Sequence, residues 1–392
     1  MTTYLNHCAI VCALGAGTDA VRGAMLAGAS GLQLSDAFSP GRALPLGRVT
    51  VDLPDAALLP PAQRSRNNQL ALAALAQIRP AVDAAIARFG ADRVGVVIGT
   101  STSGVAATEA ALRAFHAEGC LPEQFHYSQQ EMGSCAVMLS DLLDLSGPAS
   151  VQSSACASSA KALASAARLL KLGVCDAVIA GGVDTLCEFT VAGFSSLESV
   201  SAARCNPLSA NRGGISLGEA AALFLVSAEP AAVALLGWGE SSDGHHMSAP
   251  DPAGGGARLS MRAALARAGL QPGQIDYINL HGTATVQNDA MEALAVAKLF
   301  GADVALSSTK PLTGHTLGAA GALEAALCWL ALQDNPDGLL PPHLWDGVAD
   351  PALPALHLAA PGERLGRPLR YALSNSFAFG GANATLVLGS MR

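Results

Sequence analysis

The sequence is poor in charged residues, which make up 14% of its 392 residues, against 51% hydrophobic residues. Such a chain can bury a large core, and this argues against intrinsic disorder. No apolar run approaches the roughly 18–20 residues of a membrane helix, and residues 1–20 lack the basic-then-apolar order of a signal peptide. The net charge of −8 argues against general nucleic-acid binding. We therefore expect a cytoplasmic globular protein with neither a membrane nor a nucleic-acid partner.

The cysteines also lack the spacing of a disulfide framework or a zinc site. There are nine of them, an odd number, and they are scattered without a single CxxC pair. We interpret them as reduced thiols and expect no metal site.

One cysteine stands in a distinctive place. Cys156 lies between a predicted strand at 148–152 and a predicted helix at 161–170, and small residues surround it. A helix start favours a thiolate, because its unpaired N–H groups and dipole stabilise negative charge. We therefore expect a nucleophile there. The alternative, a buried structural cysteine, is the commoner role of an isolated cysteine.

Strands and helices alternate along the whole chain, which indicates an α/β fold with sheets covered by helices. The two halves of the chain show a faint internal duplication. Cys156 and His315 each begin a small-residue helix, and a strand follows each at a similar distance, at 223–226 and 386–388. We predict two similar lobes, residues 1–228 and 229–392. Strands are expected at 8–15, 93–99, 176–184, 219–226, 275–280, 304–308 and 385–388, and helices at 18–26, 70–78, 82–89, 105–118, 129–143, 258–269, 289–300 and 316–333.

Four further residues stand in Gly-, Ser- and Thr-rich loops directly after predicted strands, where α/β folds build their sites. They are His281, Lys310, His315 and Phe379. Taken singly, each has an ordinary structural role, such as a core histidine, a solvated lysine or a core aromatic residue.

Five segments together resemble the β-ketoacyl-[acyl carrier protein] synthases of types I and II, which have the thiolase fold. These segments keep the family's order, and the likeness covers nearly the whole chain. They are Ser154-Ala155-Cys156, His281-Gly282-Thr283-Ala284-Thr285, Thr309 to His315, Gly318 to Glu324 and Asn375 to Gly381.

The resemblance implies two pseudo-repeated α-β-α-β-α lobes in five layers, and a homodimer or a heterodimer with a chain-length-factor-like subunit. It implies no cofactor, because the substrates are carried on the 4′-phosphopantetheine of acyl carrier protein. The implied reaction is acyl transfer to Cys156, followed by decarboxylative Claisen condensation with a malonyl thioester, so that the chain grows by two carbons.

The resemblance also implies roles for single residues. The backbone N–H groups of Cys156 and Phe379 would form an oxyanion hole. Neutral His281 and His315 would donate hydrogen bonds to the enolate, with Lys310 and Glu324 in the network behind them. The expected substrate-binding residues are Thr283 and Thr285 on the pantetheine arm, Thr102 in the acyl pocket, Phe377 beside the gate Phe379, and Asp243 and His246 on a loop that moves with the gate. Arg64 and Arg66 would attract the acidic carrier protein.

The sequence departs from the family pattern at three places. Ala378 stands where the family usually has glycine, and segments 208–214 and 286–289 replace usual family sequences. These departures favour a secondary-metabolism synthase, for instance one that builds polyketide or polyene chains.

The sequence argues against two other classes of protein. A degradative thiolase needs a second active cysteine in the last glycine-rich segment, and residues 374–383 contain none. A non-catalytic chain-length subunit would have lost Cys156, which is present. The alternative that stays open is a catalytic or chain-length subunit of a heterodimeric ketosynthase, without elongation activity of its own.

Overall fold

The computed structural model describes residues 1–392. In the N-terminal half, a mixed sheet is built from five strands. They are β1 (Thr3–Cys12), β5 (Val94–Gly99), β6 (Ala149–Gln152), β7 (Ala177–Asp184) and β8 (Ala220–Ser227). Strand β5 pairs in parallel with β6 and β7, and β8 pairs antiparallel with β7 and β1.

The C-terminal half repeats this topology. Its strands are β9 (Val233–Ser242), β10 (Tyr277–Asn279), β11 (Ala305–Ser307), β13 (Tyr371–Phe377) and β14 (Ala382–Ser390), and the short strand β12 (His357–Leu358) extends the far edge. Strand β10 is parallel to β11 and β13, and β14 is antiparallel to β13 and β9. The duplication predicted from the sequence is therefore present. A short pairing of β1 with β9 joins the two sheets.

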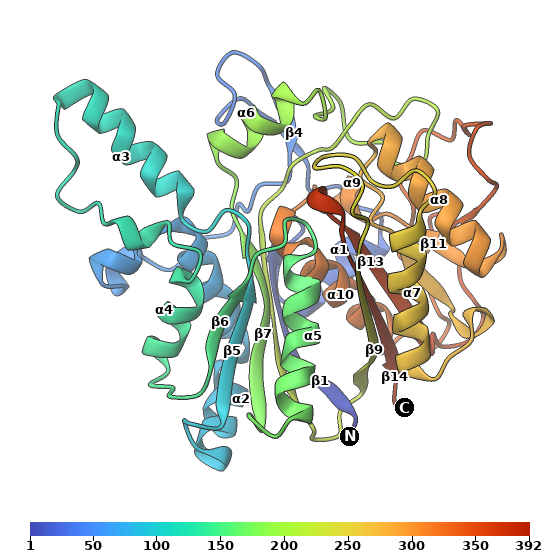
Figure 1. The fold of residues 1–392 in the computed structure, drawn as a ribbon, viewed down its shortest axis with the longest axis horizontal. Helices are drawn as coiled ribbons and strands as arrows, with labels where there is room; N and C mark the ends of the chain where they lie inside the picture. Colours follow the sequence, from blue (N-terminus) through green and yellow to red (C-terminus); the bar gives the residue numbers. More distant parts are fainter.

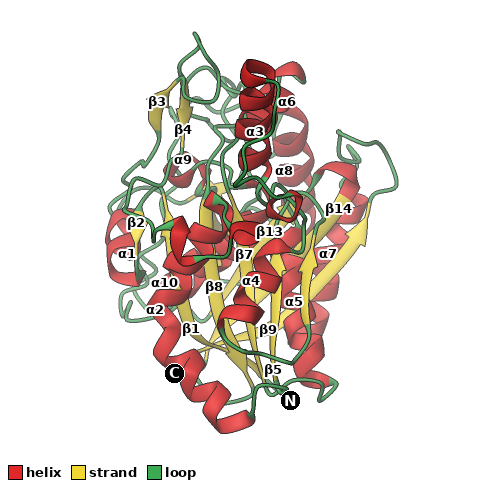
Figure 2. Ribbon diagram, turned by 90° about the vertical axis from the view of Figure 1, so that its left-hand side faces the viewer, coloured by secondary structure: helices red, strands yellow, loops and turns green.

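The sheets and helices form five layers (Figure 1). Helices α2 (Arg66–Phe89) and α4 (Ser134–Leu142) cover the outer face of the first sheet, and α7 (Gly255–Ala268) and α8 (Val286–Phe300) that of the second. Helices α5 (Ser158–Lys171) and α10 (Ala320–Ala331) fill the middle layer and pack against each other. Viewed from the side, the strands run between helices on both faces (Figure 2).

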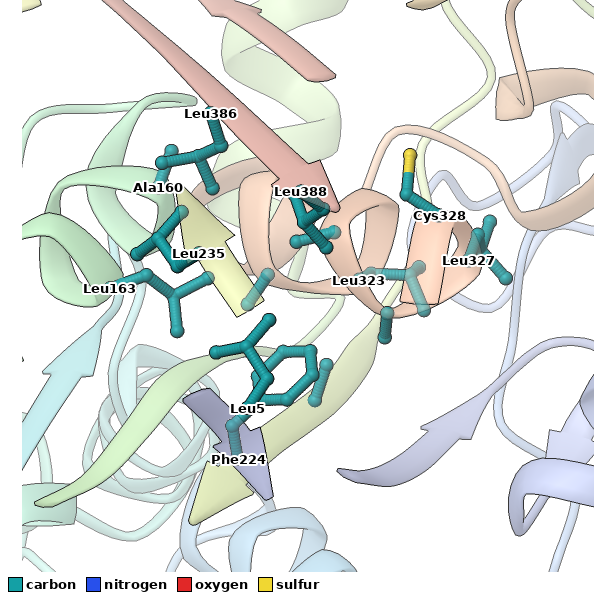
Figure 3. Packing of buried hydrophobic residues seen from close by; sticks show 14 of the residues in the cluster. Leu5, Ala160, Leu163, Phe224, Leu235, Leu323, Leu327, Cys328, Leu386 and Leu388 are labelled. Atoms are coloured by element: carbon teal, nitrogen blue, oxygen red, sulfur yellow. The ribbon is translucent and has the colours of Figure 1, made fainter. Parts of the chain in front are cut away.

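The largest apolar cluster lies in this middle layer. Figure 3 shows Leu163 of α5 and Leu323 of α10 with side chains of β1, β8, β9 and β14. Small residues bring the two central helices close together. A Cβ on Gly182 would lie 2.4 Å from Cβ of Ser159 and 2.9 Å from Cα of Ala319, so a larger residue would push both helix starts apart. This close packing places the two helix starts side by side.

Several elements differ from the predictions. The expected helices at 70–78 and 82–89 are one helix, α2, which contains Pro80. By length and composition, α2 alone would qualify as a membrane span, but this is weak evidence, because core helices pass the same test. It packs against β8 and β1. The helix expected at 129–143 begins only at Ser134, and the sequence did not predict α6 (Glu188–Ser196) or the full length of β13.

Two further helices stand at one end of the layers, above the carboxyl ends of the parallel strands. They are α3 (Val105–Glu118) and α6, which lie side by side in Figure 2. Only Ala111 of α3 and Val191 of α6 are buried, so neither helix belongs to the main core.

Candidate active site

Cys156 lies in a tight turn between β6 and α5. Ala155 has a positive φ of 46°, an uncommon backbone conformation for a residue with a side chain. The Ser158 hydroxyl fixes this turn, because it accepts a hydrogen bond from the Ser154 amide (2.8 Å) and donates one to the Ala155 carbonyl (2.6 Å). Helix α5 thus begins just beyond Cys156.

Two histidines from the other half of the molecule face the sulfur. Nε2 of His315 lies 3.0 Å from Sγ of Cys156. The rings of His281 and His315 are nearly perpendicular, with centroids 5.3 Å apart. All three side chains are buried, with exposed fractions of 6% for Cys156 and 2% for each histidine. The structure therefore brings together the three residues that the sequence placed in different lobes.

Each histidine is held through its backbone. The His281 amide donates to Glu292 Oε1 (2.8 Å) and the next amide, of Gly282, donates to Oε2 (2.7 Å). The His315 amide donates to the Ser216 carbonyl (2.6 Å), which belongs to the N-terminal half. The ring of His315 is therefore positioned by both halves of the chain.

The pKa of Cys156 corrects the sequence prediction of a stabilised thiolate. Burial raises the pKa of the thiol to about 12, while the Lys310 charge and the nearby Phe379 backbone act in the opposite direction. Helix α5 begins after the cysteine, and burial disfavours the charged form of the thiol. The neutral thiol is therefore favoured over the thiolate at Cys156.

The histidines are also neutral. Burial lowers the pKa of both His281 and His315 well below the usual value, and the Lys310 charge adds to this effect. This agrees with the expectation of neutral hydrogen-bond donors, although burial and not a helix start is the first cause. At neutral pH, each ring can therefore donate one N–H and accept at its other nitrogen.

Behind the histidines, Lys310 forms a buried ion pair with Glu324. Burial raises the pKa of Glu324 to about 7, although Lys310 opposes this shift. The pair lies within electrostatic reach of Cys156, because both charges affect the pKa of its thiol.

A small cavity of about 50 Å³ leads to these residues. Thr283 and Thr285 line it, with their hydroxyls 3.0 Å apart. Its lining consists of Cys156, Phe194, Ser199, Ile215, Asp243, Ser248, Ala249, Pro250, His281, Thr283, Thr285, Gln287, Asn288, His315, Phe377, Ala378, Phe379 and Asn383.

The expected gate Phe379 is tied to the loop at 243–250. The Gly380 amide donates to the Met247 carbonyl (2.8 Å) and the Asp243 amide donates to the Gly381 carbonyl (2.9 Å). Both Gly380 and Gly381 have positive φ, whereas Ala378 is extended and accommodates its side chain without backbone strain. The segment at Phe379 and the loop at 243–250 are thus linked through the backbone.

Four residues predicted for the site lie elsewhere or bind other partners. Thr102 is outside the cavity lining, and its hydroxyl donates to Asp184 (2.8 Å). His246 is exposed on the loop and does not line the cavity. Nε of Arg64 donates to the Leu59 carbonyl (2.8 Å). The guanidinium of Arg66 donates to both carboxylate oxygens of Glu219 (2.6 and 3.0 Å), which occupies it within the protein.

Several residues that shape the site were not predicted from the sequence. Asp184 is fully buried and accepts hydrogen bonds from Ser101, Thr102 and Gly318, so it connects both halves beside His315. The position of Asp184 at the end of a predicted strand was the signal that could have identified it. The other site residues that the sequence did not predict are Glu292, Phe194, Gln287 and Asn288.

The ligand atoms of Cys156, His281 and His315 all lie within 4.8 Å of one another. One thiolate and two neutral imidazoles are a donor set that zinc accepts. The sequence analysis expected no metal, whereas this geometry would allow a thiophilic ion to bind to the three residues.

Two pseudo-repeated lobes, with a buried cysteine from one and two neutral histidines from the other, define the class of thiol-dependent acyl-transfer enzymes with the thiolase fold. Comparisons with known proteins then identify the family. The family models "Beta-ketoacyl synthase, N-terminal domain" and "Beta-ketoacyl synthase, C-terminal domain" match residues 60–232 and 232–344.

Sequence relatives agree with this result. A 3-oxoacyl-[acyl-carrier-protein] synthase 2 from Coxiella burnetii is 35% identical over 319 residues, which are 76% of this chain and 75% of the relative. A 3-oxoacyl-[acyl-carrier-protein] synthase 2 from Rhizobium meliloti is 37% identical over 263 residues, 62% of this chain and 61% of the relative.

Among solved structures, a ketosynthase in complex with its chain length factor from Xenorhabdus doucetiae is 43% identical, with a TM-score of 0.92. The match covers 99% of this chain and 98% of that one. The chain belongs to the β-ketoacyl synthase family, and the predicted family and thiolase fold are confirmed. It is an acyltransferase that extends acyl chains by decarboxylative condensation.

Proposed function

We propose that Cys156 is the residue that carries the growing acyl chain. The observation that supports this most is the 3.0 Å contact between its Sγ and Nε2 of His315. Because the thiol has a raised pKa, it needs a proton acceptor when the thioester arrives, and the neutral imidazole supplies one. The proton passes from Sγ to Nε2, and the sulfur attacks the thioester carbonyl. The carrier sulfur leaves and takes the proton from Nε2, which restores the neutral imidazole.

The negative oxygen formed in this step requires hydrogen-bond donors. The Phe379 backbone lies close enough to the sulfur to lower the pKa of its thiol, which supports a place for its N–H beside the reacting atoms. We assign it, together with the Cys156 amide, to the oxyanion hole.

For the second half-reaction, we assign the enolate oxygen of the decarboxylating malonyl thioester to His281 and His315. Both rings are neutral, buried and within reach of the same point in the cavity. The Lys310–Glu324 pair supports this arrangement, because the lysine charge disfavours protonation of both rings. The enolate carbon then attacks the acyl group on Cys156.

The partner that delivers both substrates is proposed to be acyl carrier protein. Its phosphopantetheine arm is long and rich in amides, and the hydroxyls of Thr283 and Thr285 line the path to Cys156. The carboxamides of Gln287 and Asn288 line the same path. Arg64 stays assigned to carrier docking, whereas we withdraw Arg66, because Glu219 occupies its guanidinium.

We further propose that a second ketosynthase-type chain binds at strand β6. This strand ends the sheet order, and Ala149 and Ser150 are exposed along it. Strand edges with free backbone groups pair readily with another strand. Met132 and Val137, near this edge, are exposed apolar residues.

The 43% identity to a ketosynthase from a complex with a chain length factor favours a heterodimeric partner over a second copy of this chain. The presence of Cys156, His281 and His315 makes this chain the catalytic member of such a pair. The products are then polyketide- or polyene-like chains.

The test is labelling with a radioactive acyl-carrier thioester. We expect label on Cys156 that is lost in Cys156→Ala, and elongation that requires the partner chain. Label that persists in Cys156→Ala would refute the nucleophile. Full elongation by this chain alone, seen as a homodimer in native mass spectrometry, would refute the heterodimer.

A further inference from the structure

Helix α6 has an unusual N-terminus. The side chain of the residue before it, Cys187, contacts the Thr190 hydroxyl (3.3 Å) but makes no capping hydrogen bond to a backbone N–H of the first turn. Instead, Glu109 of α3 provides the acceptors. Its Oε2 receives the Glu188 amide (3.1 Å) and its Oε1 receives the Phe189 amide (2.7 Å).

A second contact joins the same two helices. Arg113, one turn after Glu109 on α3, forms an ion pair of 2.9 Å with Glu188 of α6. Because α6 buries only Val191, its position depends strongly on these polar contacts. In Figure 2, the two helices run side by side above the ends of the strands.

The opposite end of α6 reaches the active site. The Phe194 ring packs on the ring of the gate residue Phe379, with centroids 5.5 Å apart. Both rings line the cavity together with Cys156, and the Phe379 backbone lowers the pKa of the Cys156 thiol. A nine-residue helix therefore connects the carboxylate of Glu109 to the aromatic wall beside the nucleophile.

We propose that Glu109 is a positioning residue for acylation. It fixes the start of α6, and α6 holds Phe194 against Phe379, which keeps the Phe379 amide directed at the oxyanion of the acylation step. This inference builds on the proposed role of Cys156. The histidines that would serve decarboxylation are held by other contacts, to Glu292 and Ser216, so that half-reaction should not depend on Glu109.

The experiment compares the two half-reactions in Glu109→Ala, Glu109→Gln and a control, Glu118→Ala, which removes an exposed carboxylate at the end of the same helix. We expect Glu109→Ala to slow acylation of Cys156 by about three- to thirty-fold, the range that corresponds to loss of a helix cap. Glu109→Gln keeps an acceptor oxygen and should lose less. Glu118→Ala should acylate at the wild-type rate.

The second readout is decarboxylation of a malonyl thioester in a Cys156→Gln background. Adding Glu109→Ala to it should change this rate by less than about twofold. A general structural role would slow both half-reactions together and would overturn the proposal. An unchanged acylation rate in both Glu109 variants would overturn it as well.

A double-mutant cycle with Phe194→Leu tests the route through α6. If Glu109 acts through Phe194, the two acylation defects are not additive. Additive defects would refute the route. If Cys156 is not the nucleophile, label persists in Cys156→Ala. The Glu109 variants test only the positioning role, because their labelling is slow but still depends on Cys156.

Discussion

Cys156 and His315 are separated by 159 positions in the sequence, yet Sγ of one lies 3.0 Å from Nε2 of the other. The two central helices that follow these residues pack so closely that a Cβ on Gly321 would lie only 2.7 Å from the backbone nitrogen of Ala160. A neutral thiol next to a neutral imidazole is a pair that reacts only when substrate supplies an electrophile. This relationship underlies the first two predictions.

The first prediction concerns alkylation of Cys156. Its raised pKa of about 12 means that the thiol is the main form at all lower pH values, so the thiolate fraction grows with pH. The rate with iodoacetamide should therefore rise by about tenfold per pH unit from pH 7 to 9. Active-site alkylation followed by peptide mass spectrometry measures this rate. A plateau near neutral pH would instead indicate the stabilised thiolate expected from the helix start.

The second prediction separates the two half-reactions. Cys156→Gln should abolish condensation, because no sulfur remains to carry the acyl group, while malonyl decarboxylation persists through the histidines. Release of labelled carbon dioxide and product chromatography measure the two activities. Retained condensation would contradict the nucleophile. Serving as a matched control, Cys120→Ala changes an exposed cysteine and should leave both activities intact.

The third prediction concerns the charge state of the histidines. Both pKa values are lowered, so the rings stay neutral as pH falls through 6.5, the ordinary pKa of histidine. Decarboxylation by Cys156→Gln should therefore stay nearly constant between about pH 8 and 6. Replacing His281 by Ala should lower it by about a hundredfold or more, as for loss of an oxyanion-hole donor. A rate that halves near pH 6.5 would show ordinary titration.

The fourth prediction is that Glu324→Gln destabilises the protein. It leaves the buried Lys310 ammonium without its charged partner, which typically costs about 3–5 kcal/mol. Denaturant unfolding measures the change in the free energy of unfolding. The same variant should lower the pKa of Cys156, because Glu324 contributes to raising it. An unchanged unfolding midpoint would show that the ion pair is unimportant for stability.

The fifth prediction distinguishes two neighbouring arginines. Arg64→Glu should raise KM for carrier-bound substrates more than for the matching pantetheine thioesters, because only the carrier carries the acidic surface. Arg66→Glu should mainly lower stability, since it places a carboxylate beside Glu219, whose side chain is buried. Both arginine variants are tested by thermal unfolding and by measuring KM for the carrier-bound and the pantetheine substrates. Equal KM changes for both substrates in Arg64→Glu would remove the docking role.

The sequence predicted most of the architecture from local signals. The buried strands Val94–Gly99 and Ala177–Asp184, with glycines in or at the end of each, and the helix Val105–Glu118 follow from apolar spacing and turn residues. Helix α6 was not predicted, because its cap comes from Glu109, about eighty positions away. The continuous helix α2 was missed because Pro80 usually ends a helix.

Residue identity alone determined which chemistry this protein has available: a cysteine after a strand, two histidines and a lysine in loops after strands, and glycines where helices must approach. The fold decided the protonation states and the distances, because burial sets the pKa of a thiol or an imidazole, and burial comes from elements distant in the chain. It also decided which charged side chains are occupied within the protein, as the Arg66–Glu219 pair shows. Such contacts form only when separate segments pack together, and no local pattern encodes them.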